Sequence, residues 1–164
     1  MFVVFMLTIT ILTACLPWVL KALANKSYVS KPKGSASWLP LLAAMLFAVS
    51  YVLPTINISG TETFQQHFVG GGIYSACLFI YFRHTLGWKL PKYTAILFLF
   101  AWVSALGVAN ELFEFTLHQL HLVEIDISDT SWDLVANTLG AFAGYLLLHP
   151  LLGSGSSVND RHQR

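Results

Sequence analysis

The chain alternates between five long apolar runs and short polar connectors. Each run is close to the roughly 20 residues that an α-helix needs to cross about 30 Å of hydrocarbon. Pro40 stands in the first turn of the second run, where a helix tolerates proline. The pattern predicts helices over 2–23, 38–56, 67–86, 93–117 and 131–152. We therefore expect an all-α fold, a polytopic membrane helix bundle with five transmembrane helices in a single domain, 1–152.

The first apolar run has a second interpretation as a cleaved secretory signal. Leu12-Thr13-Ala14-Cys15 is similar to a lipoprotein cleavage site. However, no Lys or Arg precedes the run, and it is longer than the roughly 7 to 15 residues of a signal core. Because lysines follow it, we predict a retained helix whose C-terminal end lies at the cytoplasmic face.

Charge is distributed unevenly along the chain. Hydrophobic residues make up 55% and charged residues only 10% of the 164 residues, which excludes an ordinary soluble domain. Every Lys and Arg falls within 21–33, 83–92 or 161–164. The positive-inside rule then predicts an N-terminus outside, a C-terminus inside and a polar cytoplasmic tail, 153–164.

The acidic residues gather where no base accompanies them. No Lys or Arg occurs between Lys92 and Arg161, and that interval contains Glu111, Glu114, Glu124, Asp126, Asp129 and Asp133. Carboxylates partly withdrawn from water need protons, hydrogen-bond donors, a metal or a cationic ligand. This requirement is the clearest indication of function in the sequence.

Three predicted helices carry polar stripes that reach a similar depth. At about 100° per residue, the stripes are Ser104, Gly107, Glu111, Glu114 and His118 on the fourth helix, Asp133, Asn137, Gly140 and Gly144 on the fifth, and His67, Gly71 and Tyr74 on the third. Counted from Tyr93 at about 1.5 Å per residue, Glu111 lies about 27 Å along its helix, near the outer boundary of the membrane. We expect these helices to form one polar cluster, made of His67, Glu111, Glu114, Asp133 and Asn137.

Small residues mark where the helices are expected to pack. Three consecutive glycines, Gly70 to Gly72, cost a helix roughly 1 kcal/mol each relative to Ala, so close packing or a bound ligand must offset them. The spacing Gly140-x-x-x-Gly144 permits close approach of a neighbouring helix. The predicted packing positions are Gly70, Gly71, Gly140 and Gly144.

The cluster has the composition of a site for a divalent cation. Oxygen ligands with one or two imidazoles suit Mg²⁺, Mn²⁺ or Zn²⁺. The expected ligands are Glu111, Glu114, His67 and Asp133, and the expected catalytic residues are Asp133 as ligand or general base, Glu111, and Asn137 to orient a bound ligand. Such an ion polarises phosphoryl oxygens, so the predicted partner is a membrane lipid or a lipid-linked phosphate at the outer leaflet.

Each of these polar residues also has a purely structural interpretation. Thr130-x-x-Asp133 is similar to a capping box, so a helix cap is the alternative role for Asp133. Glu111 and Glu114 have the alternative of being protonated or reaching outer water, and Asn137 that of an interhelical hydrogen bond.

Two further classes of function stand beside the enzyme. One is a non-catalytic membrane protein that binds an envelope ligand or scaffolds an assembly. The other, proton-coupled transport, is less favoured because no acid lies at mid-membrane. We predict no nucleic-acid partner, and the oligomeric state stays open.

The spacing of these residues resembles a known pattern. VanZ-like membrane proteins resemble the chain in His67-Phe68, Glu111-x-x-Glu114 and Asp129-Thr130-x-Trp132-Asp133-x-x-x-Asn137-x-x-Gly140-Ala141-x-x-Gly144. The chain is at least as similar to the YjdF-type family of bacterial inner-membrane proteins of unknown function, over about 67–148. The resemblance implies a multi-pass protein of the bacterial plasma membrane with a role in the cell envelope. VanZ-like proteins usually carry Gln where Glu114 stands and an Arg shortly before the aspartate, and this chain has neither.

Overall fold

The computed structural model describes residues 2–26, 36–55, 63–122 and 127–153. The regular structure in these residues is all helical, which confirms the predicted all-α class for them. The elements are α1 (Phe2–Lys26), α2 (Trp38–Ser50), α3 (Phe64–Gln66), the π-helix η2 (His67–Ile73), α4 (Tyr74–Thr85), α5 (Lys92–Gln119) and α6 (Ile127–Gly153). Because α3, η2 and α4 follow one another without a break, the described chain forms five helical rods. Nearly all of the predicted tail, 154–164, lies outside the described residues.

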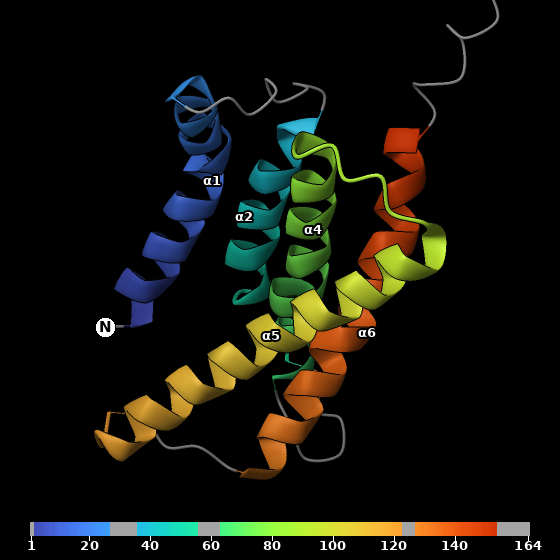
Figure 1. Ribbon diagram of the computed structural model, residues 1–164. Coiled ribbons are helices and arrows are strands. Elements are labelled where there is room, and N and C mark those ends of the chain that lie inside the picture. Colours follow the sequence, from blue (N-terminus) through green and yellow to red (C-terminus); the bar gives the residue numbers. More distant parts are fainter. Residues whose placement is uncertain (1, 27–35, 56–62, 123–126, 154–164) are drawn as a thin grey trace, which may run out of the picture.

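The rods form a layer that one long helix crosses. In Figure 1, α2, α4 and α6 stand side by side, and α1 packs against α2 at the left edge of the view. η2 continues the α4 rod downward and makes its most extensive contact with α6. α5 runs diagonally across the front of the layer and packs on α4 and α6. Because α5 is tilted, the distance of a residue along the α5 axis is larger than its depth measured along the axes of α2, α4 and α6.

Among the residues that the structure describes, two helices are long and apolar enough to cross a membrane by length and composition. They are α1, through Met6–Leu23, and α5, over Lys92–Gln119. Large apolar side chains cover the outer surface of the bundle, and Trp18, Leu97 and Leu146 are each more than 60% exposed. Contiguous apolar surface of this kind is typical of contact with lipid.

α2 ends earlier than its apolar run predicts. The helix stops at Ser50 instead of residue 56, and the N–H groups of Val52 and Leu53 both donate to the Val49 carbonyl oxygen, at 2.9 and 3.2 Å. Leu53 precedes Pro54, which disfavours helical geometry at Leu53, and Pro54 has no N–H to extend the ladder. At 13 residues α2 is about 20 Å long, so the predicted helix 38–56 was too long.

α6 begins earlier than predicted, and this changes the role of Asp133. The helix starts at Ile127 instead of residue 131, so Thr130 lies inside it and Asp133 lies in its second turn. The capping-box interpretation of Asp133 is therefore wrong. Asp133 is only 3% exposed, and a buried carboxylate that caps no helix needs its partners elsewhere.

The closest contact between helices joins η2 to α6 through glycine. A Cβ atom on Gly140 would overlap the carbonyl oxygen of Phe68, and one on Gly72 would lie 2.5 Å from the carbonyl oxygen of Asn137. The two backbones thus touch, as small residues allow in membrane helices. η2 is a π-helix throughout, and π-helical turns occur frequently at functional sites.

The hydrophobic core fills the space between α2, α4, α5 and α6. Leu39, Phe79, Leu99 and Ala141 are essentially inaccessible, one from each helix. Their packing joins the three upright helices to the crossing helix α5. The site described below therefore stands on a rigid framework.

The two ends of the bundle differ in charge. The last turns of α1 and α4 and the first turn of α5 lie in the upper half of Figure 1, and these segments carry or adjoin Lys21, Arg83 and Lys92. η2, the end of α5 and the start of α6 lie in the lower half, and they carry the histidine and acids of the predicted site.

Candidate metal centre

Three of the predicted ligands meet in the lower half of the bundle. His67 opens η2, Glu111 lies late in α5 and Asp133 lies in the second turn of α6. One ligand atom from each, a His nitrogen or a carboxylate oxygen, lies within 4.8 Å of the others. Atoms bound at about 2.1 Å to one ion are at most about 4.2 Å apart, so a small side-chain rotation suffices to close the set. Asp133 is buried, and His67 and Glu111 are half-buried.

Asp133 is held through both of its carboxylate oxygens. Oδ2 lies 3.2 Å from His67 Nε2, and Oδ1 accepts a hydrogen bond from Thr63 Oγ1 at 3.0 Å. These two contacts fix the rotamer of Asp133 and orient the imidazole. Thr63 was not predicted, because the expected third helix began at His67, whereas Thr63 is the N-cap residue of α3, one turn before His67.

Glu114 does not belong to the group of three. Asn110 Nδ2 donates to its Oε1 at 2.8 Å, one helical turn away along α5. At about 100° per residue, Glu114 is rotated by about 60° from Glu111 and lies about 4.5 Å further along the axis. This offset and the local hydrogen bond account for its separation from the predicted ligand set.

Asn137 lies one turn further along α6 than Asp133, in a space that Gly71 leaves open. A Cβ on Gly71 would overlap Asn137 Oδ1, and a Cβ on Gly107 would lie 3.5 Å from its Nδ2. The side chain is 4% exposed, and Oδ1 has no hydrogen-bond partner among the described residues. A buried acceptor without a donor is costly, so this oxygen is suited to a ligand or a bound water.

The helices that form the site bring two carboxyl groups together but carry no Lys or Arg near them. The chain has no Lys or Arg from residue 93 to residue 160, so neither α6 nor α5 beyond its first residue supplies one. A proton on His67 compensates one carboxylate at most. One nitrogen and two carboxylate ligands in a partly buried setting match the donor set of Zn²⁺ or Mn²⁺.

A comparison with protein families places this region in a known group. The family described as "Predicted membrane protein (DUF2238)" matches residues 64–153, more than half of the chain. The matched range includes His67, Glu111 and Asp133, and it begins one residue after Thr63. No curated protein and no solved structure matches the chain.

Proposed function

Because the chain belongs to the DUF2238 family of predicted membrane proteins, we propose that it binds one divalent cation at His67, Glu111 and Asp133 and acts there on the phosphate of a lipid or lipid-linked molecule. The observation that carries the proposal is the approach of three ligand atoms from three helices to within 4.8 Å of one another. The segments that hold them are far apart in sequence, so folding alone brings them together.

The residues have separate roles in the proposed reaction. His67, Glu111 and one carboxylate oxygen of Asp133 would hold the cation, which would supply the positive charge that polarises a phosphoryl oxygen. Asp133, oriented by Thr63, accepts the proton of the attacking water. The water oxygen bonds to phosphorus, the ester P–O bond breaks, and the leaving oxygen takes the proton back from Asp133. Asn137 Oδ1 accepts a hydrogen bond from the bound water.

The orientation of the site follows from the charge pattern. We infer five membrane crossings with the N-terminus outside and the C-terminus inside, in the plasma membrane of a bacterium. The segregation of basic segments at one end of the bundle and of acids at the other supports this topology. α2 requires either local thinning of the bilayer or the residues after Ser50 to complete its crossing. The residues shared with VanZ-like and YjdF-type proteins support a role in the cell envelope.

Phosphate release tests the proposed activity. The purified protein, loaded with Mn²⁺ or Zn²⁺, is incubated in detergent with dioleoyl phosphatidic acid or a polyprenyl diphosphate. We expect release of phosphate that EDTA abolishes and that Glu111→Gln lowers by at least about 100-fold. Glu114→Gln is the matched control, since it removes the same charge three residues away, and we expect it to retain most of the activity.

The alternative function has a distinct outcome. If both lipids bind in a manner that requires Glu111 but no phosphate is released from either, the protein is a non-catalytic binder. Release that is equal in the wild type and in Glu111→Gln would overturn the proposed site.

A further inference from the structure

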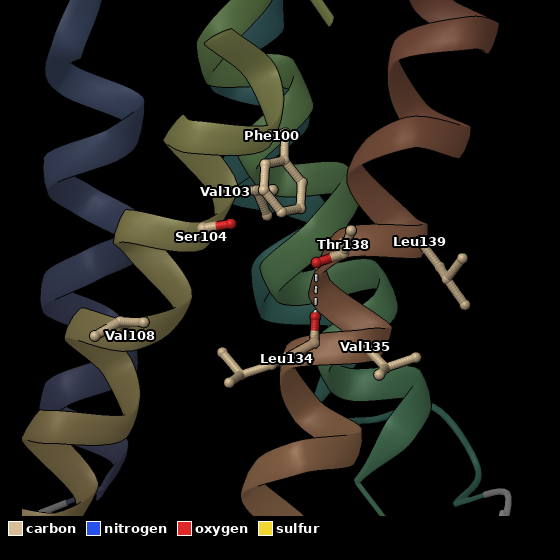
Figure 2. Close-up of a pocket in the computed structure, with 8 residues that line it drawn as sticks. All are labelled: Phe100, Val103, Ser104, Val108, Leu134, Val135, Thr138 and Leu139. Carbon is tan, nitrogen blue, oxygen red and sulfur yellow. Dashed lines mark hydrogen bonds between the residues drawn. The ribbon is translucent and has the colours of Figure 1, made fainter. Parts of the chain in front are cut away.

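An apolar groove of about 400 Å³ lies between α5 and α6 (Figure 2). Its floor is Val103, which is 1% exposed. Its rims are Phe100 and Val108 from α5 and Val135 and Leu139 from α6, each close to half exposed. The groove is therefore open to the side, toward the surroundings of the helix pair.

The lining offers almost no polar chemistry. Thr138 Oγ1 donates to the Leu134 carbonyl oxygen at 2.8 Å, shown as a dashed line in Figure 2, so this hydroxyl is used within α6. Ser104 contributes the other hydroxyl, and none of the described residues that line the groove is charged. Such a lining disfavours a polar or ionic occupant and suits hydrocarbon.

The groove begins beside the candidate metal centre. Val108 precedes Glu111 by three residues on α5, and Leu134 directly follows Asp133 on α6. Gly107 stands between the two spaces, because a Cβ there would lie 3.0 Å from Leu134 Cδ2 and 3.5 Å from Asn137 Nδ2. From Val108 the groove extends to Phe100, about 12 Å toward the N-terminal end of α5.

We propose that this groove holds one hydrocarbon chain of a membrane lipid whose phosphate lies at His67, Glu111 and Asp133. The proposal rests on the proposed function and narrows its substrate to an amphiphile that has one hydrocarbon chain in the groove and its phosphate at the metal centre. In a membrane protein the open side of the groove faces lipid tails, and the polar end of the groove leads to the only described group of three or more metal-ligating side chains. Burial of the hydrocarbon chain in the groove selects lipids by their tails, and the metal centre binds their phosphate.

The test compares three probes that separate the tail from the phosphate. Dioleoyl phosphatidic acid carries both, dioleoylglycerol carries only the tails, and glycerol 3-phosphate carries only the phosphate. Binding of each to the Mn²⁺-loaded protein is measured by native mass spectrometry in detergent. We expect phosphatidic acid to bind at least about tenfold more tightly than glycerol 3-phosphate, since even two buried CH₂ groups contribute that much.

Two variants fill the groove from opposite walls. Ser104→Phe and Thr138→Phe project a larger apolar side chain into it, and Leu97→Phe makes the same kind of change on the exposed surface of α5 outside it. We expect either groove variant to remove the preference for phosphatidic acid while metal content is retained, and Leu97→Phe to leave both unchanged. If one groove variant fails to fold, the other decides.

The outcomes distinguish the groove from the metal centre. Binding of both lipids that depends on Ser104 but not on Glu111 would support the groove and refute the phosphate site. Phosphatidic acid binding that depends on Glu111 but is unchanged in both groove variants would overturn the groove. A dimer of the wild type that Ser104→Phe converts to a monomer would overturn it too, because a second copy of the chain would then be its occupant.

Discussion

At the scale of single residues, the candidate centre depends on side-chain contacts that spacing does not specify. Glu111 and Glu114 share one face of α5, yet only Glu111 reaches His67 and Asp133. Asn110, which lies one turn before Glu114 on α5, donates a hydrogen bond to the Glu114 carboxylate. Thr63 and His67 together hold the buried carboxylate of Asp133. Function at this site is therefore predicted to be sensitive to the contacts of Asp133 and insensitive to Glu114.

The hydrogen bond from Thr63 provides a test of this arrangement. Thr63→Val keeps the shape of the side chain but removes its donor to Asp133 Oδ1. We expect a loss of about 1 kcal/mol in the free energy of unfolding and weaker cation binding, because the carboxylate is no longer held in one rotamer. Thermal unfolding in detergent and a Mn²⁺ titration measure the two effects.

Thr116→Val is the matched control for this substitution. Its hydroxyl donates to the Leu112 carbonyl oxygen on the exposed side of α5, so its removal should alter neither quantity by much. Equal effects of the two substitutions would mean that Thr63 has no special relation to the centre.

At the scale of helices, the apolar runs predicted how many rods form and where most of them lie, but not how they end or cross. The apolar run continues beyond Ser50, yet α2 ends at Ser50, because Pro54 disfavours helical geometry in the residue before it. The segment before Ser131 is polar, yet it joins α6 and turns Asp133 from a supposed cap into an interior carboxylate. The diagonal course of α5 results from packing, and periodicity within one helix holds no information about it.

The same limit applies to the site. Helical period and span counting were enough to suggest that His67, Glu111 and Asp133 lie at one depth. They could not separate Glu114 from this set, because its separation depends on the hydrogen bond from Asn110 and on the angle at which α5 crosses the other helices. They also did not find Thr63, because the predicted helix began at His67, whereas the helical rod begins one turn earlier with Thr63 as the N-cap residue of α3.

The contact between η2 and α6 predicts that alanine substitutions at two glycines of α6 destabilise the protein to different degrees. In Gly140→Ala the new methyl group would overlap the Phe68 carbonyl oxygen, which is backbone and cannot rotate away. We expect a loss of at least about 3 kcal/mol in the free energy of unfolding, since overpacking against backbone forces the helices apart. Thermal unfolding in detergent, with near-ultraviolet circular dichroism as a second probe, measures it.

Gly144→Ala serves as the milder comparison on the same helix. Its methyl group would meet the Ala76 Cβ at 3.0 Å, the Ile73 Cγ2 at 3.1 Å and the Ile73 Cα at 3.2 Å, which are tight contacts but not the overlap expected at Gly140. We expect a loss of about 1 kcal/mol. A Gly144→Ala variant less stable than Gly140→Ala would show that the tight approach at Gly140 does not determine the stability of the pair.

At the scale of the whole molecule, an apolar outer surface encloses a bundle that is basic at one end and acidic at the other. The family assignment identifies a membrane protein. The charge distribution predicts which end faces the cytoplasm. On that prediction the candidate centre faces the outer leaflet.

Cysteine labelling in intact cells tests this orientation. In a background without Cys15 and Cys77, Gln119→Cys and Lys89→Cys place exposed thiols at opposite ends of the molecule. We expect a membrane-impermeant maleimide to label Gln119→Cys in intact cells and Lys89→Cys only after lysis. The reverse pattern would place the acidic end in the cytoplasm and exclude an outer-leaflet substrate.

The most informative measurement on this protein is the divalent-metal content of the purified chain, determined by inductively coupled plasma mass spectrometry after loading with Mn²⁺ or Zn²⁺ and removal of free metal. We predict about one ion per chain in the wild type and in Glu114→Gln, and loss of at least about 90% of it in Glu111→Gln, because removing a charged ligand costs well over 1.4 kcal/mol of binding. A wild type that retains no metal, or a Glu111→Gln variant that retains as much as the wild type, would contradict the proposed centre.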